Sequence, residues 1–145
     1  MTTRAKVSAA CATVVLAVAG LATAYDREPP DLGMTIDEVR TEWPPVVGGN
    51  VPTFVTLTNR TPRPVRLLGN HVMACGNNVC YAAKFFPPKA LAPGESVVIE
   101  YDLMPRAAGP YSAETTLFVY RDGQIQYVPV AFTGTTLPAP EQLAP

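Results

Sequence analysis

The sequence predicts an all-β protein, an antiparallel β-sandwich of about seven strands, and three observations carry this prediction. The 145-residue chain contains 16 prolines, and proline, which fixes φ and lacks a backbone donor, suits short strands and turns better than long helices. Apolar and polar residues alternate in several short segments, as they do in half-buried strands. Turn residues bound these segments at short intervals, and no segment supplies the crossover helix that parallel strands need.

The length and charge of the chain limit what the protein can be. A chain of this length suits a single domain with its own core. Charged residues make up 16% of the chain and the formal net charge is −1, where a quarter of residues is the usual charged fraction. Because no basic face is available to neutralise phosphates, we expect no nucleic-acid partner.

Residues 1–24 are predicted to be a signal peptide. Arg4 and Lys6 precede the apolar run Ala9–Gly20, and small residues follow at the positions that signal peptidase requires, before Tyr25. Once this peptide is removed, we expect no membrane insertion and an exported protein that is periplasmic, envelope-associated or secreted. The alternative is a retained N-terminal anchor, for which the apolar segment is barely long enough.

Residues 25–45 are predicted to be a polar, proline-rich leader segment. Thr35 and Glu38 have the spacing of a capping box, which favours a short helical turn. The alternative is an edge strand that stops at the Pro-Pro pair after Trp43, so the sequence leaves helix and strand open for residues 35–42. Trp43 itself is expected to be a core side chain at one end of the sandwich.

Residues 46–135 are predicted to form the sandwich, and residues 136–145 a proline-rich tail that buries nothing. The first strand alternates, so that Thr53, Val55 and Leu57 share one face. Turn residues then separate six further strands, which we expect over residues 64–70, 71–75, 79–86, 97–103, 112–120 and 124–133.

Two residue patterns in the last hairpin predict local structure: a turn signal and a proline within a strand. Asp122-Gly123 is among the strongest two-residue hairpin signals. Pro129 lies within the strand that follows, and because proline cannot donate to a ladder it suits an edge strand or a bulge. We therefore expect either that the last strand lies at the edge of its sheet or that it is bulged at Pro129.

Cys75 and Cys80 are the two cysteines that remain after signal-peptide cleavage. In an oxidising compartment an even pair is expected to form a disulfide. The residues between them begin with Gly76-Asn77-Asn78, which has strong turn chemistry. The pair is therefore predicted to staple a hairpin near its tip.

The motifs of this chain resemble those of a known group of domains. They are Phe54–Thr61, Cys75-Gly76, Leu91–Ser96 (Leu-Ala-Pro-Gly-Glu-Ser) and Phe132-Thr133-Gly134. In this order and spacing the chain resembles the bacterial immunoglobulin-like modules of unknown function that are related to ASH (Hydin-like) domains. The resemblance implies an immunoglobulin-like sandwich outside the cytoplasm and brings no catalytic residue with it. In that family the second cysteine lies close behind the glycine, whereas three residues intervene here after Gly76.

The sequence offers one candidate metal site. His71, Met73, Cys75 and Cys80 are the soft and imidazole ligands that copper prefers. The chain has a single His, and cysteines joined in a disulfide are no longer thiolate ligands. We therefore expect no metal, no cofactor and no catalytic residue, with a solvent-facing His71 and a core Met73.

The sequence thus predicts a non-enzymatic, exported immunoglobulin-like module of the cell envelope with a structural or protein-interaction role. Such modules bind partners through surfaces or through exposed edge strands, to which a partner adds a strand. The alternative is a small extracytoplasmic copper-binding protein that uses His71, Met73 and the cysteine pair. Neither the protein partner nor the oligomeric state can be named from the sequence.

Overall fold

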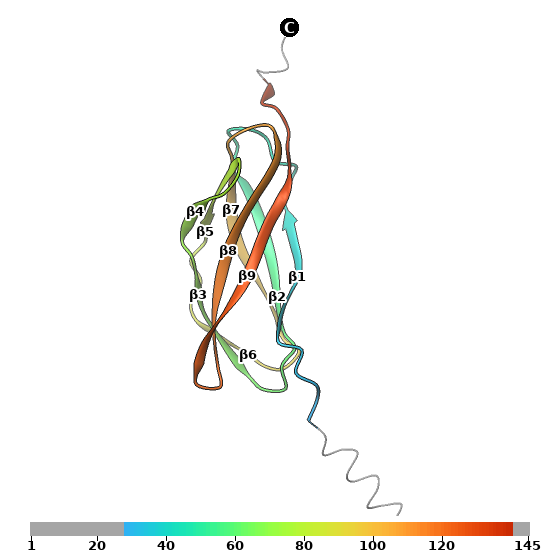
Figure 1. Ribbon diagram of the computed structural model, residues 1–145, viewed down its shortest axis with the longest axis vertical. Helices are drawn as coiled ribbons and strands as arrows, with labels where there is room; N and C mark the ends of the chain where they lie inside the picture. The colour runs from blue at the N-terminus through green and yellow to red at the C-terminus, as the bar shows by residue number, and fades with distance from the viewer. Residues whose placement is uncertain (1–27, 141–145) are drawn as a thin grey trace, which may run out of the picture. The chain divides into compact units, whose positions relative to one another are not determined.

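The computed structural model describes residues 28–140, so the predicted signal peptide and the last residues of the predicted tail lie outside the described residues. Residues 31–140 form a sandwich of two antiparallel sheets (Figure 1). The nine strands of the described chain are β1 (Met34–Thr41), β2 (Val51–Asn59), β3 (Val65–Asn70), β4 (Met73–Cys75), β5 (Val79–Ala83), β6 (Lys89–Leu91), β7 (Ser96–Pro105), β8 (Gly109–Arg121) and β9 (Gln124–Thr136).

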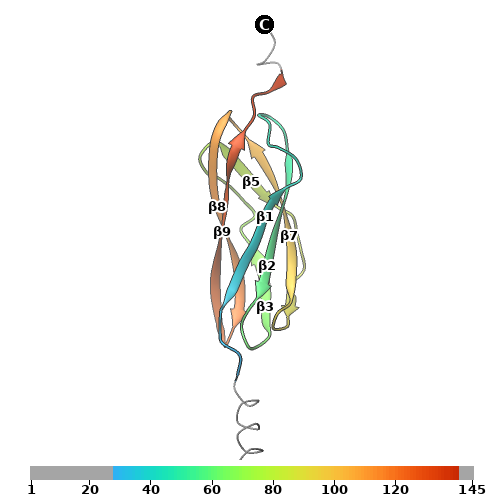
Figure 2. The same cartoon turned by 90° about the vertical axis from the view of Figure 1, so that its right-hand side faces the viewer.

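The two sheets divide these strands unequally. The five-stranded sheet has the order β1-β2-β7-β5-β4, and the four-stranded sheet has the order β6-β3-β8-β9. Figure 2, turned by 90° from Figure 1, shows β8 and β9 on one side of β1, β2 and β7. Every strand pair is antiparallel. The predicted all-β sandwich is confirmed, with β1 and β6 added to the seven expected strands.

β1 corrects the predicted start of the domain. Residues 34–41, assigned to the leader segment, pair with β2, so the open choice between helix and strand is decided for strand. Thr35 pairs with Thr58 rather than capping a helix. A helical turn this short is marginal in water, whereas the neighbouring edge of β2 offers a partner for each of several backbone groups.

The two ends of the sandwich correct two further expectations. Trp43 is 50% exposed and is not the predicted core side chain. Thr136 ends β9, and the next residue, Leu137, forms an isolated β-bridge with Val46. The first residues of the predicted tail are therefore paired, because the backbone groups beyond β9 find partners in the segment that follows β1.

The core lies between the two sheets and centres on three aromatic rings. Tyr81 on β5, Tyr101 on β7 and Phe132 on β9 meet at ring-centroid distances of 5.1–6.1 Å. The Tyr101 hydroxyl accepts a hydrogen bond from Asn70 at 3.3 Å, and burial, the largest cause, raises the pKa of Tyr101 to about 12. Val55 and Leu57 are fully buried together with Thr53, so the face of β2 that these three residues share is the inward one.

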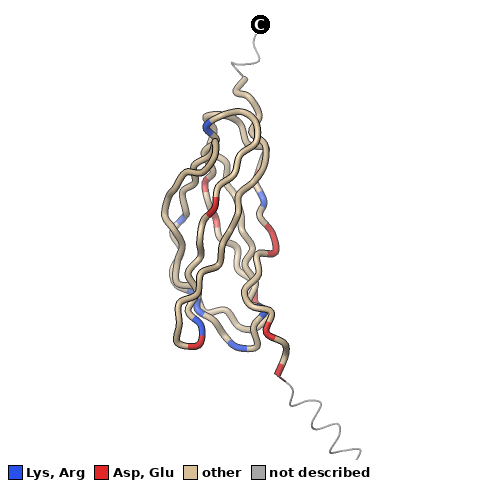
Figure 3. Tube along the Cα trace, viewed as in Figure 1, with Lys and Arg blue, Asp and Glu red and all other residues tan. Residues whose placement is uncertain are grey.

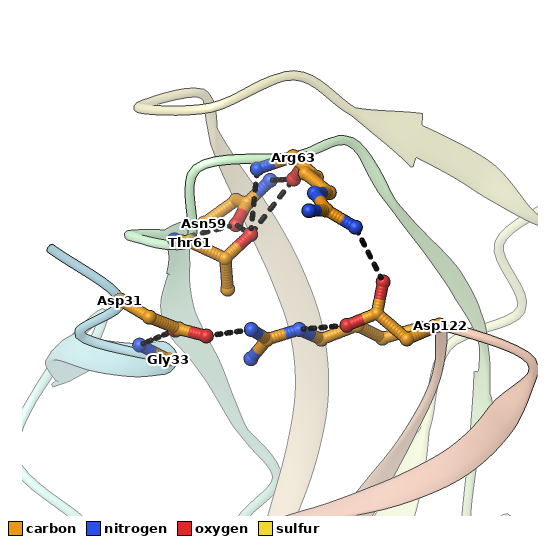
Figure 4. Close-up of polar contacts among 7 residues, drawn as sticks. Asp31, Gly33, Asn59, Thr61, Arg63 and Asp122 are labelled. Atoms are coloured by element: carbon orange, nitrogen blue, oxygen red, sulfur yellow. Dashed lines mark hydrogen bonds and ion pairs between the residues drawn. The ribbon is translucent and has the colours of Figure 1, made fainter. Parts of the chain in front are cut away.

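The turn between β2 and β3 is built around Asn59, which is fully buried (Figure 4). Its side-chain amide donates to the carbonyl oxygens of Arg63 at 2.9 Å and Leu91 at 3.0 Å. Its side-chain oxygen accepts from the backbone and hydroxyl of Thr61 at 2.9 and 2.7 Å. All polar atoms of this buried amide are thus paired, and Asn59 closes β2.

A chain of ionic contacts lies beside this turn. Arg121 at the end of β8 pairs with Asp31 and, at 3.3 Å, with Asp122. Asp31 also accepts a hydrogen bond from the backbone N–H of Gly33 at 3.0 Å. These contacts hold the entry to β1 against the β8–β9 hairpin. Within the described residues there is no helix of the length and apolarity that crossing a bilayer requires.

Candidate interaction surface

The two sheets of the described chain have four edge strands, and three of them carry devices that discourage pairing. β4 and β6 are three residues long. β1 carries the charged residues Asp37, Glu38 and Arg40 and is interrupted by an irregularity between Ile36 and Glu38. Short length, charge and bulges are the usual means by which sheet edges avoid unwanted partners. Figure 3 shows these charges on β1.

At the irregularity in β1, Asp37 has no cross-strand partner on β2. Its carboxylate lies at the end of β2. Asp37 accepts hydrogen bonds from the hydroxyls of Thr58 at 2.5 Å and Thr35 at 2.8 Å. It also pairs with the guanidinium of Arg60 at 3.0 Å. The hydrogen bonds from Thr58 and Thr35, followed by Arg60, lower the pKa of Asp37. β1 is thus held to the sandwich by a polar clamp as well as by its ladder.

β9 differs from the other edges in length and in charge. It runs for thirteen residues, pairs with β8 without interruption, and contains no charged residue. On its other side no strand pairs with it among the described residues. Ile125 and Tyr127 are 55% and 69% exposed. A long, uncharged, apolar edge is the kind that invites a further strand.

The hairpin turn determines which backbone groups of β9 face this open edge. Asp122 and Gly123 have φ of 50° and 78°, as a type I′ turn requires, and in such a hairpin the closing pair Arg121–Gln124 exchanges hydrogen bonds. Hydrogen-bonded and non-hydrogen-bonded pairs then alternate along the ladder. The backbone groups of the even-numbered residues of β9 therefore bond to β8, and those of the odd-numbered residues point to the open edge. Consistently, even-numbered Ser112 of β8 bonds on its opposite side, to Asn77.

Pro129 lies at one of the outward-facing positions, opposite Thr116. Its missing N–H therefore removes no bond to β8. Of the two alternatives for Pro129, an edge strand or a bulge, the structure has the edge strand. The free edge as a whole offers N–H and C=O groups at residues 125, 127, 131, 133 and 135, and a carbonyl alone at 129. We call this row of backbone groups the β9 edge.

Beside the β9 edge lies a group of aromatic and apolar side chains, all exposed except the half-buried Phe118, which we call the outer patch: His71, Phe118, Tyr120, Ile125 and Tyr127. Phe118 and Tyr127 are opposite each other and their rings meet edge to face at 5.6 Å. The ring of His71 lies 5.3 Å from that of Phe118. Tyr120 is opposite Ile125 and is 46% exposed. Aromatic side chains of this kind dominate the energetics of protein interfaces.

Gly134 shows how the far end of β9 is held in place. A Cβ at this position would lie 2.6 Å from the hydroxyl oxygen of Tyr111, its partner on β8. The tyrosine ring therefore covers the glycine, and burial raises the pKa of Tyr111. This packing secures β9 from its inner side and leaves its edge open.

The predicted disulfide between Cys75 and Cys80 is present, and these two residues are direct cross-strand partners on β4 and β5. The hairpin tip between them docks on β8. A Cβ at Gly76 would lie 2.2 Å from the carbonyl oxygen of Ser112, so only glycine allows this approach. The loop is short, and the disulfide contributes about 2 kcal/mol in the chain-entropy account.

The candidate copper ligands are not brought together. His71 is exposed, as expected, and packs against Phe118 of the four-stranded sheet, whereas Met73 belongs to β4 of the five-stranded sheet. Met73 is 65% exposed, so the expectation of a core methionine is wrong. In residues 28–140 there is no group of three His, Cys, Asp or Glu side chains suited to a metal ion. The geometry therefore lends the copper alternative no support.

The comparisons with known proteins agree with this architecture. No protein-family model matches the sequence, and no curated protein matches it. Among solved structures the chain is similar to the ASH/PapD-like domain of human CEP192 (PapD-like domain 7), with a TM-score of 0.50 and 12% identity over 78% of this chain and 91% of that chain. At this identity the likeness concerns the fold alone. The resemblance expected from the motifs is confirmed at that level: this chain has the immunoglobulin-like fold of ASH/PapD-like domains.

Proposed function

We propose that this protein is a non-enzymatic, exported protein-interaction module of the cell envelope that binds an extended segment of a partner at the β9 edge. The observation that carries the proposal is the contrast among edges. Three edge strands of the described chain are short or charged, whereas β9 is long, uncharged and flanked by the outer patch. Apart from the missing donor of Pro129, the β9 edge carries no such protection, and an edge of this kind in a folded protein is best explained by a partner that uses it.

The geometry of the β9 edge indicates which properties the partner segment has. Main-chain hydrogen bonds to residues 125, 127, 131, 133 and 135 supply affinity that does not depend on sequence. At residue 129 the edge has no N–H donor, so one carbonyl of the partner segment is left without a hydrogen bond and the tightest pairing lies on either side of Pro129. The side chains of the partner segment that lie beside Ile125 and Tyr127 on the outer face are apolar or aromatic, because they cover exposed apolar side chains.

A peptide-display experiment tests this directly. Randomised linear peptides of about ten residues, a strand's length, are selected on the mature protein, and the selected peptides are bound while amide exchange is followed by NMR. We expect alternating apolar residues in the selected peptides. We also expect new protection of the amides of Ile125, Tyr127, Ala131, Thr133 and Thr135, which have no partner on that side in the free protein.

Two variants give this experiment its matched control. Ala131→Lys places a charge beside the β9 edge and is expected to weaken peptide binding at least tenfold. Glu38→Lys places the same side chain on β1, the other long edge, and is expected to leave binding unchanged. Protection that appears on β1 or β4, or equal binding by both variants, contradicts the proposal.

The exported location is tested separately. Expression of the full chain in a bacterial host, followed by fractionation and mass spectrometry, is expected to yield a mature protein that begins at Tyr25 outside the cytoplasm. A product that keeps residues 1–24 in the membrane fraction supports the retained-anchor alternative. A product that stays in the cytoplasm contradicts export.

A further inference from the structure

The two sulfur atoms of the Cys75–Cys80 disulfide lie in different surroundings. Cys75 is exposed on β4, an edge strand of the five-stranded sheet. Cys80 is only 5% exposed on β5, which lies between β4 and β7. A thiolate from solvent therefore reaches the sulfur of Cys75 far more readily than that of Cys80.

A cation contacts the buried sulfur. The guanidinium of Arg106 donates to Sγ of Cys80 at 3.5 Å, and the backbone N–H of Arg106 donates to the carbonyl of Asn78 at 2.9 Å. The arginine is thus anchored to the loop that the disulfide closes. A positive charge beside a sulfur lowers the free energy of its thiolate, which makes that sulfur the better leaving group in thiol–disulfide exchange.

The hairpin tip is held to β8 by bonds that do not involve sulfur. Asn77 and Ser112 exchange two backbone hydrogen bonds, at 2.7 and 3.1 Å. The side-chain amide of Asn78 donates to the carbonyl of Pro110 at 3.1 Å, and Gly76 donates to Val79 at 2.8 Å within the loop. Since none of these bonds involves sulfur, we expect the tip to stay docked on β8 when the disulfide opens.

We propose that Cys75 is a thiol-exchange site and that Cys80, stabilised by Arg106, is the leaving sulfur. A thiolate of a dithiol reductant attacks Sγ of Cys75. A bond forms between the reductant and Cys75, the Cys75–Cys80 bond breaks, and Cys80 leaves with the electron pair as a thiolate. The second thiolate of the reductant then attacks its own bonded sulfur and releases the Cys75 thiolate. The reductant ends as a disulfide, and the protein has gained two electrons.

The first measurement locates the attacked sulfur. The mature oxidised protein is mixed with reduced glutathione, quenched with excess N-ethylmaleimide and mapped by peptide mass spectrometry. We expect glutathione on Cys75 and the maleimide on Cys80 in at least nine of ten singly attacked molecules. Equal labelling of the two cysteines, or a preference for glutathione on Cys80, overturns the proposal.

The second measurement tests Arg106 as the residue that stabilises the leaving sulfur. Arg106→Gln is expected to slow the exchange with glutathione threefold or more, and Arg106→Lys to restore most of the rate. Arg66→Gln, which removes an exposed charge from β3, is the control and is expected to react like the natural protein. If Arg106→Gln reacts as fast as the natural protein, the assignment of Arg106 is wrong.

The third measurement asks whether the tip stays docked. After full reduction, the amides of Asn77 and Ser112 are expected to keep their protection from hydrogen exchange within about tenfold. Their complete loss, with the rest of the sandwich intact, would show that the disulfide is a structural staple and would overturn a reversible exchange site. None of these readouts depends on a partner at the β9 edge.

Discussion

β1 and β9 are the long edge strands of the two sheets, and they are built in opposite ways. β1 is eight residues long, charged and interrupted, and none of its residues is fully buried. β9 is thirteen residues long, uncharged and uninterrupted, and it alternates buried and exposed residues where it crosses the core. β1 is held by a polar clamp at Asp37, whereas β9 is held by the aromatic core around Phe132 and by Tyr111 over Gly134.

This difference shows that the interactions that hold an edge strand in the sandwich are not the same as the features that keep further strands from pairing with it. The charges of β1 contribute little to the core, but they repel a further strand from that edge. The inner face of β9 makes it integral to the core, and its free side carries no such protection apart from the missing donor of Pro129. The following predictions compare the two strands, in order of decreasing effect.

The largest effect is expected from Phe132→Ala in β9. Phe132 is 1% exposed and contacts the rings of Tyr81 and Tyr101. Removing a buried aromatic ring leaves a cavity and typically lowers the free energy of unfolding by about 3–5 kcal/mol. Urea denaturation measures the loss. Ala131→Ser, on the exposed face of the same strand, is the control and is expected to change stability by less than about 0.5 kcal/mol.

A smaller effect is expected from Ile36→Ala in β1. Ile36 is only partly buried against the core, so we expect about 1 kcal/mol, below the range of fully buried aliphatic residues. The same denaturation experiment applies. A loss equal to that of Phe132→Ala would mean that β1 is as integral to the core as β9, which would end the contrast between them.

Pro129→Ala is expected to change stability by less than about 0.5 kcal/mol, because position 129 makes no bond to β8. The new amide at position 129 is expected to exchange with solvent nearly as fast as an unfolded peptide. The amide of Val130, which points to β8, is expected to stay protected. A protected amide at position 129 would show that the alternation inferred for the β9 edge is wrong.

The smallest effect concerns the clamp at Asp37 and depends on pH. The pKa of Asp37 is lowered in the folded protein by Thr58, Thr35 and Arg60, so the clamp stabilises the fold above the unfolded-state pKa of about 3.9. That contribution is lost as pH falls through the folded-state pKa. Asp37→Asn is therefore expected to lower Tm at pH 7, with a difference from the natural protein that shrinks below about pH 4. A constant difference from pH 7 to pH 3 would contradict the clamp.

Most of the sandwich can be predicted from the sequence, because its strands obey local rules. Alternation places Val55 and Leu57 on one face of their strand, the face that the structure buries, and Asn59 closes its turn with its own side chain. The outer patch was missed for a physical reason. In β8 the residues from Leu117 to Tyr120 are apolar on both faces, so alternation does not separate core from surface there. The register that follows from the Asp122-Gly123 turn, which pairs Phe118 with Tyr127, was the signal that could have found it.

By itself the sequence determined the features that depend on near neighbours: the turns, the strand alternation, the pairing of Cys75 with Cys80, and the restriction of Pro129 to an edge strand or a bulge. Tertiary structure alone decided β1, because its short polar segment becomes a strand only when the edge of β2 supplies its hydrogen bonds. It also decided which edges remain open and that Arg106 lies against Cys80. These features join residues far apart in the chain, and no local rule specifies which distant groups will meet.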